Sequence, residues 1–190
     1  SANRIDCLLN GQPRRYVQLG TVMTKREYRG KGYCRRSMER VLADCRDCDG
    51  VFLYANDSVL DFYPKFGFRP AEEYRYRFAL AGAETVSVRP FPMASPENWR
   101  RLPLGQFQGV PRPDNEGLFL FYLTGPMRES VFYHPGMDAY IAAELEDGVL
   151  SVYGVFSPRP VDLVEACRAF GPQVRRVEFA FTPADRSGLE

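Results

Sequence analysis

The chain has 190 residues, 45% apolar and 26% charged, a composition typical of globular proteins and unlike that of disordered chains. Its 25 lysines and arginines are nearly balanced by 24 aspartates and glutamates, so the net charge is only +1 and bulk binding of a nucleic acid is not expected. The longest apolar run, residues 118–123, is far shorter than the roughly 20 residues of a membrane span, so no membrane association is expected.

The first half of the chain begins with a predicted hairpin. Residues 4–9 and 14–24 are rich in strand-forming residues, and Asn10-Gly11 between them is a hairpin turn signal. A polar loop over residues 25–32 follows. We then expect a helix over residues 33–46, because Met38, Val41, Leu42 and Cys45 form one apolar stripe at helical spacing.

Two further strands and a second helix complete the pattern of this half. Residues 51–55 form a nearly continuous apolar strand, as in a sheet interior. Residues 58–66 repeat the helical apolar spacing, but Pro64 lacks a backbone donor, so the last turn is expected to be distorted or to end early. Residues 74–80 alternate well enough to be a strand.

The second half has a different character. Residues 89–113 contain six prolines, which predicts a connection with one short helix near residues 96–102. Residues 117–127 fit a helix or a strand equally well. The other expected elements are strands over residues 131–133, 139–146, 149–156 and 174–181 and a helix over residues 161–170.

Alternating strands and helices predict an α/β protein with a mixed (α+β) sheet, divided into residues 1–82 and residues 83–190. The second half ends in the order strand, strand, loop, helix, strand, as the first half begins. A distant internal duplication would explain this order. The loop at residues 157–160 holds no glycine, so a second copy would lack the glycine-rich loop of the first.

The segment Arg29-Gly30-Lys31-Gly32-Tyr33-Cys34 lies between a predicted strand and a predicted helix. Glycines let a backbone approach a ligand closely, and the first N–H groups of a helix have no internal partners, which makes such a terminus an anion site. Residues 25–36 hold six cations and one anion, a local net charge of +5. Phosphate binding and a merely solvated basic loop both remain open on these grounds.

The five cysteines are too few and too scattered for a disulfide scaffold, and they indicate reduced thiols in a cytoplasmic protein. Cys45 and Cys48 form a lone Cys-x-x-Cys pair, and His134 is the only histidine. A structural zinc would need two further ligands, so no metal is expected. The alternative, a redox role for the pair, stays open.

The residues 28–33, Tyr-Arg-Gly-Lys-Gly-Tyr, resemble motif A of the GNAT superfamily of acyl-CoA-dependent N-acetyltransferases, whose pattern is Gln/Arg-x-x-Gly-x-Gly/Ala. Arg29 fills the first slot and Gly32 the fourth, while Cys34 stands where Gly or Ala is usual. Asn56, Tyr63 and Phe66-Gly67-Phe68 are similar to motif B of the same family. The resemblance covers about residues 14–80.

This resemblance implies a partial GNAT-like fold, in which residues 83–190 form a second small α/β domain that is a degenerate GNAT-like half. It implies acetyl-CoA as co-substrate and direct attack by a small amine or a peptide amine. The family's cofactor-binding roles fall on backbone or side-chain groups of Val22, Met23, Thr24, Arg29, Gly30, Lys31, Gly32, Tyr33, Cys34, Arg35 and Asn56.

In the same family, Tyr63 corresponds to the general acid that protonates the departing CoA thiolate. Tyr63 also lies on the apolar stripe of its predicted helix, so a purely structural role in the core is the alternative. The elements that precede the hairpin in this family are missing before residue 14, and we therefore expect the chain to be a fragment.

Two other functions compete with an acetyltransferase. A non-catalytic CoA-binding sensor would use the same glycine loop without turnover. A nucleic-acid module would need aromatic residues among the cations, and only Tyr28 and Tyr33 qualify. A homodimer is left open, because aromatic residues of the second half would suit a dimer face as well as a core.

Overall fold

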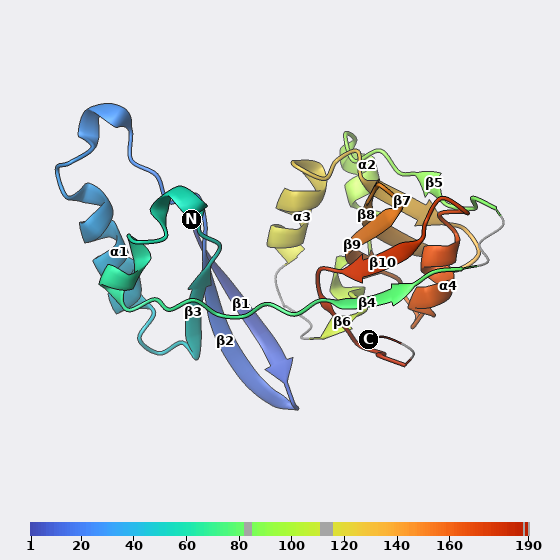
Figure 1. Ribbon diagram of the computed structural model, residues 1–190, viewed down its shortest axis with the longest axis horizontal. Helices are drawn as coiled ribbons and strands as arrows, with labels where there is room; N and C mark the ends of the chain where they lie inside the picture. Colours follow the sequence, from blue (N-terminus) through green and yellow to red (C-terminus); the bar gives the residue numbers. More distant parts are fainter. Residues whose placement is uncertain (82–84, 111–115, 188, 190) are drawn as a thin grey trace. The chain divides into compact units, whose positions relative to one another are not determined.

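The computed structural model describes residues 1–81, 85–110, 116–187 and 189, and it divides the chain into two compact units, Ser1–Glu73 and Tyr74–Glu190 (Figure 1). The expected boundary after residue 82 falls where the chain is not described. The observed boundary comes earlier because β4 (Tyr76–Ala79) pairs with a strand of the second unit. The strand expected over residues 74–80 therefore belongs to the second unit.

The first unit is built on a three-stranded sheet in the order β1 (Ala2–Leu9), β2 (Gln12–Leu19) and β3 (Gly50–Leu53). β1 and β2 form the expected antiparallel hairpin, and Asn10 and Gly11 at its turn both have positive φ, 51° and 75°. Positive φ at both central residues matches the right-handed twist of a hairpin. β3 pairs in parallel with β2, from Tyr16 opposite Gly50 to Leu19 opposite Leu53.

The strand predicted over residues 14–24 ends earlier, at Leu19. Thr21 has φ of 49°, in the left-handed region, and a residue in that conformation cannot continue a strand. The short 3₁₀ helix η1 (Arg26–Tyr28) follows. Val22, Met23 and Thr24 therefore belong to the loop after β2, and the expectation that they extend the strand is wrong.

The helix predicted over residues 33–46 is α1 (Tyr33–Asp44). Its Met38 is buried against Val17 and Leu19 of β2, and these three form the centre of the first unit's core. A parallel pair of strands joined by a helix that covers them is the βαβ arrangement, in which ligands bind beyond the carboxyl ends of the strands. In this unit that position is the loop after Leu19.

The helix predicted over residues 58–66 is replaced by two short 3₁₀ helices, η2 (Asp57–Val59) and η3 (Tyr63–Phe66). Pro64 cannot donate a backbone hydrogen bond, and Gly67 ends η3 with φ of 88°. Three members of the predicted apolar stripe, Phe62, Tyr63 and Phe66, pack against the core of the unit, whereas the fourth, Val59, is 39% exposed.

The second unit has a six-stranded mixed sheet in the order β4, β10, β9, β8, β7, β5. Its strands are β5 (Arg89–Pro90), β7 (Val131–His134), β8 (Ala139–Glu146), β9 (Val149–Phe156) and β10 (Arg176–Phe179), and β6 (Gly109–Val110) pairs separately with β11 (Thr182–Pro183). The helices are α2 (Pro96–Trp99), η4 (Leu104–Gln106), α3 (Glu116–Thr124) and α4 (Leu163–Arg168). Residues 117–127, left open by the sequence, are thus largely helical.

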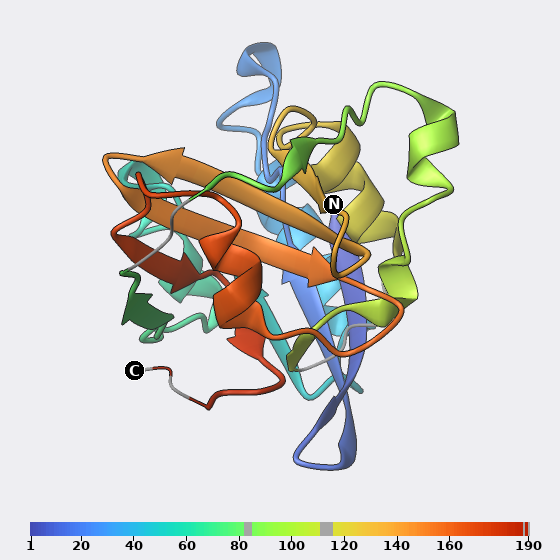
Figure 2. The ribbon, with the colours of Figure 1, turned by 90° about the vertical axis from the view of Figure 1, so that its right-hand side faces the viewer.

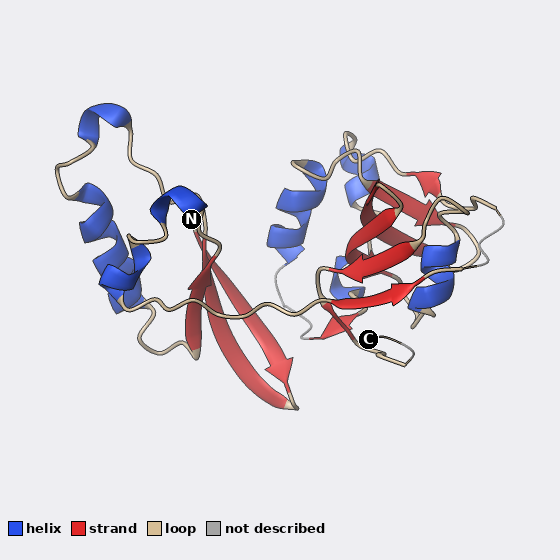
Figure 3. Cartoon of the chain, viewed as in Figure 1, coloured by secondary structure: helices blue, strands red, loops and turns tan. Residues whose placement is uncertain are grey.

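The two faces of this sheet support two apolar clusters. Ile141 and Ala143 of β8 pack with Ala166 and Cys167 of α4, whereas their neighbours Tyr140 and Ala142 pack on the other face with Leu123 of α3. This alternation follows from the two-residue period of a strand. It places α3 and α4 on opposite faces of the sheet (Figures 2 and 3).

Both units contain the same sequence of pairings. In the first, an antiparallel hairpin is followed by α1 and by β3, parallel to β2. In the second, the antiparallel hairpin β8–β9 is followed by α4 and by β10, parallel to β9. The expected likeness of order is therefore confirmed at the level of topology, while the duplication itself stays a prediction.

We expect Ile141→Ala to destabilise the second unit by about 2–5 kcal/mol, because Ile141 is completely buried and its truncation leaves a cavity. Leu145→Ala on the same strand should cost much less, since Leu145 is 39% exposed. Trp99 is the only tryptophan and lies in the second unit, so its fluorescence during urea unfolding reports on that unit. Equal unfolding midpoints for the two variants would contradict this description of the core.

Candidate functional site

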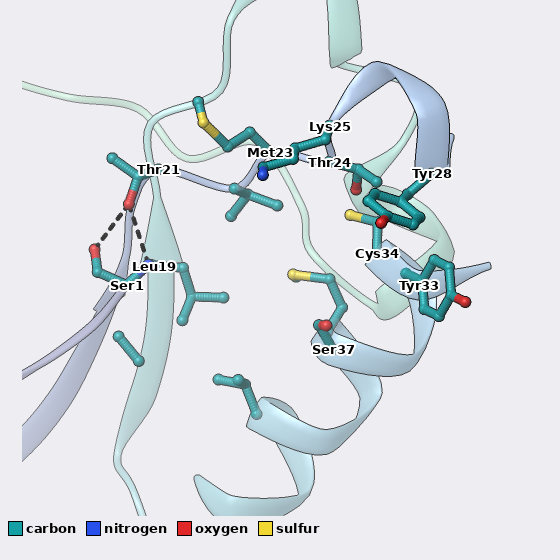
Figure 4. A pocket seen from close by; sticks show the side chains of 14 residues that line it. Ser1, Leu19, Thr21, Met23, Thr24, Lys25, Tyr28, Tyr33, Cys34 and Ser37 are labelled. Carbon is teal, nitrogen blue, oxygen red and sulfur yellow. Dashed lines mark hydrogen bonds between the residues drawn. The ribbon is translucent and has the colours of Figure 1, made fainter. Parts of the chain in front are cut away.

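A cavity of about 620 Å³ opens in the first unit at the carboxyl end of β2 (Figure 4). Its walls come from the beginning of β1, from the loop after β2 and from the first three turns of α1. The residues that line it are Ser1, Ala2, Leu19, Thr21, Val22, Met23, Thr24, Lys25, Tyr28, Tyr33, Cys34, Ser37, Met38 and Val41. The volume is within the range of small-molecule sites.

The N-terminus of α1 lies at one end of this cavity, where Figure 4 shows Tyr33 and Cys34 beside Tyr28. Its N-cap is Gly32, in the left-handed conformation with φ of 78°, and no side chain caps the helix. Within the described residues, the backbone N–H groups of residues 30–35 donate no hydrogen bond to the protein. They are therefore open to an anion, which the helix dipole also favours.

Gly30 and Gly32 have φ of 75° and 78°, and a β-carbon added at either would meet no heavy atom within 4 Å. The glycines are thus required by the backbone conformation and not by crowding inside the protein. The open space above them is where an anion would approach the free N–H groups. This geometry fits the loop predicted from the sequence.

Three cations of the loop already have partners within the protein. The Arg29 Nε donates to the carbonyl oxygen of Thr24 at 3.1 Å, and this hydrogen bond stabilises the conformation of the loop between them. Lys31 lies over the ring of Tyr28, 5.4 Å from its centre. Arg35 lies 5.6 Å from the ring centre of Phe66 and 3.7 Å from a carboxylate oxygen of Glu39. Their charge remains near the helix N-terminus, because all three are on or beside it.

Tyr63 is half-buried and packs edge-on against Phe62 and Phe68, with ring centres 5.4 and 6.0 Å apart. Burial raises the pKa of its hydroxyl, and the neighbouring Cys34 raises it further. Tyr63 does not line the cavity, whereas Cys34 does. The packing of the Tyr63 ring in the core fits the structural role, and the catalytic role stays a prediction.

Asn56 is exposed at the N-cap of η2, where its backbone carbonyl accepts from the N–H of Val59 and its side chain makes no capping bond. It follows the last paired residue of β3, Leu53, just as the cavity-lining loop follows Leu19 on β2. Asn56 does not line the cavity.

The cavity brings together five of the predicted residues, Val22, Met23, Thr24, Tyr33 and Cys34. Arg29, Gly30, Lys31 and Gly32 form the loop between two lining residues, Tyr28 and Tyr33, whereas Arg35, Asn56 and Tyr63 lie outside the lining. The sequence analysis did not assign Leu19, Met38 and Val41 to the site. The signal for Met38 and Val41 was the apolar stripe of α1, which indicates core packing and cannot show a gap within it.

The second unit offers no equivalent anion site at its corresponding helix. The side chain of Asp162 accepts from the N–H groups of Val164 and Glu165, at 2.9 and 3.1 Å, and so caps α4. The expectation that the second copy lacks the loop's chemistry is consistent with this cap.

The cysteines are all free, and Cys7 and Cys167 are buried. In the described part of the chain, no group of three or more His, Cys, Asp or Glu side chains could hold a metal ion. The same residues include no helix that is both long and apolar enough to cross a membrane.

Comparison with known proteins relates the first unit to one family. Residues 5–68 match the model of the acetyltransferase (GNAT) family. A search of curated proteins gave no match.

Two solved structures share the fold. One is Eis1 from Mycobacterium abscessus, with 18% identity and a TM-score of 0.52 over 98% of this chain and 54% of that one. The other is a probable N-acyltransferase from Enterococcus faecalis V583, with 15% identity and a TM-score of 0.54 over 94% of this chain and 50% of that one. The chain therefore spans about half the length of these structures. The predicted GNAT-like α/β fold is confirmed, while the degenerate GNAT-like origin of the second unit stays a prediction.

Gly32→Ala should weaken the expected binding of CoA at least about tenfold, because a side chain at φ of 78° is strained and relief of that strain would move the free N–H groups. Gly11→Ala is the matched control, since Gly11 has φ of 75° and equally open surroundings but lies in the distant hairpin. Calorimetric titration of both variants with CoA, and their melting temperatures, separate backbone strain from loss of the site. Equal affinities would exclude the loop as the anion site.

Proposed function

We propose that the chain binds acetyl-CoA and transfers its acetyl group to a primary amine, because residues 5–68 match the model of the acetyltransferase (GNAT) family. The observation that carries this proposal is the uncapped N-terminus of α1, with free N–H groups, beside a cavity of suitable size. The acceptor would be a small amine or a peptide amine.

The pyrophosphate of the substrate would lie on the N–H groups of residues 30–35. These donors are fixed by the helix and the loop, so they need no reorganisation when an anion arrives. The local charge of +5 adds an attraction for phosphates that acts beyond contact distance. Arg29, held on Thr24, contributes mainly by fixing the shape of the loop.

The pantetheine arm would follow the loop of Val22, Met23 and Thr24, whose backbone is not committed to the sheet. Within the described residues, the backbone groups of Val22 and Met23 make no hydrogen bond to the protein. They are available to the amides of the arm, as the edge of a sheet is to an added strand.

In the reaction, the amine nitrogen attacks the thioester carbonyl carbon, and the carbon–sulfur bond breaks as the amide forms. The departing thiolate needs a proton, and the family resemblance gives the role of donor to the hydroxyl of Tyr63. Because burial raises the pKa of Tyr63, this hydroxyl keeps its proton through neutral and mildly alkaline pH.

A binding role without catalysis is the second candidate. One observation favours it, because Tyr63 and Asn56 stand outside the lining of the cavity. This candidate shares the CoA site but predicts no turnover with any amine.

The direct test is calorimetric titration of the chain with acetyl-CoA. We expect the affinity to fall as the salt concentration rises from about 0.1 M to about 1 M, because the Debye screening length falls from about 10 Å to about 3 Å. Lys31→Gln should lower the affinity. Arg40→Gln should not, since Arg40 lies farther along α1 and is paired with Asp44 at 3.0 Å. No binding at low salt would refute both candidates.

Tyr63→Phe should lower kcat for acetyl transfer about 10²-fold or more and leave the KM for acetyl-CoA nearly unchanged. Since the raised pKa keeps Tyr63 protonated, its contribution should persist at neutral pH and be lost only above the usual tyrosine value of about 10. Tyr16→Phe, another half-buried tyrosine of the first unit, is the control. Product formation is measured by mass spectrometry from about pH 7 up to the pH at which the protein unfolds. Unchanged turnover in Tyr63→Phe would remove the catalytic role of Tyr63.

A further inference from the structure

The cavity does not end at the anion site but continues along α1. Cys34 lies in the first turn of the helix, Met38 in the second and Val41 in the third, and all three line the cavity. Cys34 and Val41 are seven positions apart, which at about 1.5 Å per residue corresponds to about 10 Å along the helix.

The character of the walls changes over this distance. At the helix N-terminus they carry polar groups of Thr24, Lys25 and Tyr28, as Figure 4 shows. Beyond it they include the apolar side chains of Ala2, Leu19, Met38 and Val41, together with the small polar side chains of Ser1, Thr21 and Ser37. Leu19 and Met38 are only 5% and 4% exposed, so at this end the cavity borders the apolar core of the first unit.

The order of these walls along the cavity determines which part of an acyl-CoA would meet them. With the pyrophosphate over residues 30–35 and the arm along residues 22–24, the thioester comes to the end of β2, at Leu19. An acyl chain attached there would point toward Met38 and Val41. In Figure 4, Leu19 projects from the strand toward the side on which Ser37 of α1 lies.

We infer that the apolar end of the cavity, bounded by Leu19, Met38 and Val41, holds the acyl group and accepts chains longer than acetyl, with Val41 limiting their length. This inference rests on the proposed function and names its substrate class as short- to medium-chain acyl-CoA thioesters. The flexible Met38 suits such a site, because methionine adapts its shape to apolar ligands.

The magnitude of the effect follows from the burial of methylene groups. Each methylene moved from water into an apolar site contributes up to about fourfold in affinity. The four extra methylenes of hexanoyl-CoA should therefore strengthen binding markedly over acetyl-CoA. A pocket shaped for acetyl alone would give the reverse order.

The test titrates the 190-residue chain with CoA, acetyl-CoA, butanoyl-CoA and hexanoyl-CoA by calorimetry. We expect affinity to rise from acetyl-CoA to butanoyl-CoA and hexanoyl-CoA, by at least about tenfold overall. Hexanoyl-CoA binding no tighter than acetyl-CoA, while CoA itself binds, overturns the inference and leaves the proposed function standing. If neither CoA nor any thioester binds, the proposed function fails and the inference fails with it.

Variants at one position of α1 test the direction of the chain. Val41→Phe fills the apolar end and should reduce the ratio of hexanoyl-CoA to acetyl-CoA affinity to about one, whereas Val41→Ala should raise it. Ala43→Phe places the same ring on an exposed position of the same helix and should keep the original ratio. Melting curves confirm folding, and if Val41→Phe does not fold, the Val41→Ala ratio decides. An unchanged ratio in a folded Val41 variant overturns the role of this residue.

Discussion

The unpaired N–H groups at the start of α1 are the feature on which the first unit's chemistry depends. Every helix begins with N–H groups that lack a partner within the helix, and most proteins satisfy them with a serine, threonine, aspartate or asparagine side chain. Gly32 occupies that position in α1 and offers no side chain. The donors are thus left to solvent or to a ligand, and the surrounding positive charge selects an anion.

The second unit shows the alternative solution on the same topology. Its helix α4 follows the hairpin β8–β9 as α1 follows β1–β2, but Asp162 caps it with two hydrogen bonds. A carboxylate at this point both occupies the donors and repels a phosphate. The same order of elements therefore leaves the N–H donors free in one unit and capped in the other, and the difference lies in the residue that precedes the helix.

Sequence patterns predicted those elements whose local signals agree with their packing. The Asn10-Gly11 turn, α1 and the hairpin β8–β9 all lie close to where periodicity and turn residues put them. The helix over residues 58–66 was wrong because Pro64 and Gly67 outweighed a correct apolar stripe. The strand over residues 14–24 was too long because its composition does not reveal the left-handed backbone at Thr21.

Part of the site can likewise be predicted from local sequence, and part depends on contacts between segments far apart in the chain. Gly30, Gly32 and the charges around them are local features, and the sequence alone indicated an anion site there. The apolar end of the cavity depends on how Met38 and Val41 of α1 meet Leu19, which lies far from them along the chain. An apolar stripe specifies which side of a helix faces a sheet, but it does not specify whether the two surfaces close completely.

The partners of the loop cations bear on how the site would recognise a phosphate. Arg29 is fixed on Thr24, Lys31 lies over Tyr28, and Arg35 lies between Phe66 and Glu39. Side chains held in this way would attract a phosphate through their positive electrostatic potential more than through direct hydrogen bonds to it. Direct contacts then fall to the backbone N–H groups, whose positions do not depend on rotamers. A site built from backbone donors is sensitive to the conformation of Gly30 and Gly32 and comparatively tolerant of the identity of any single cation.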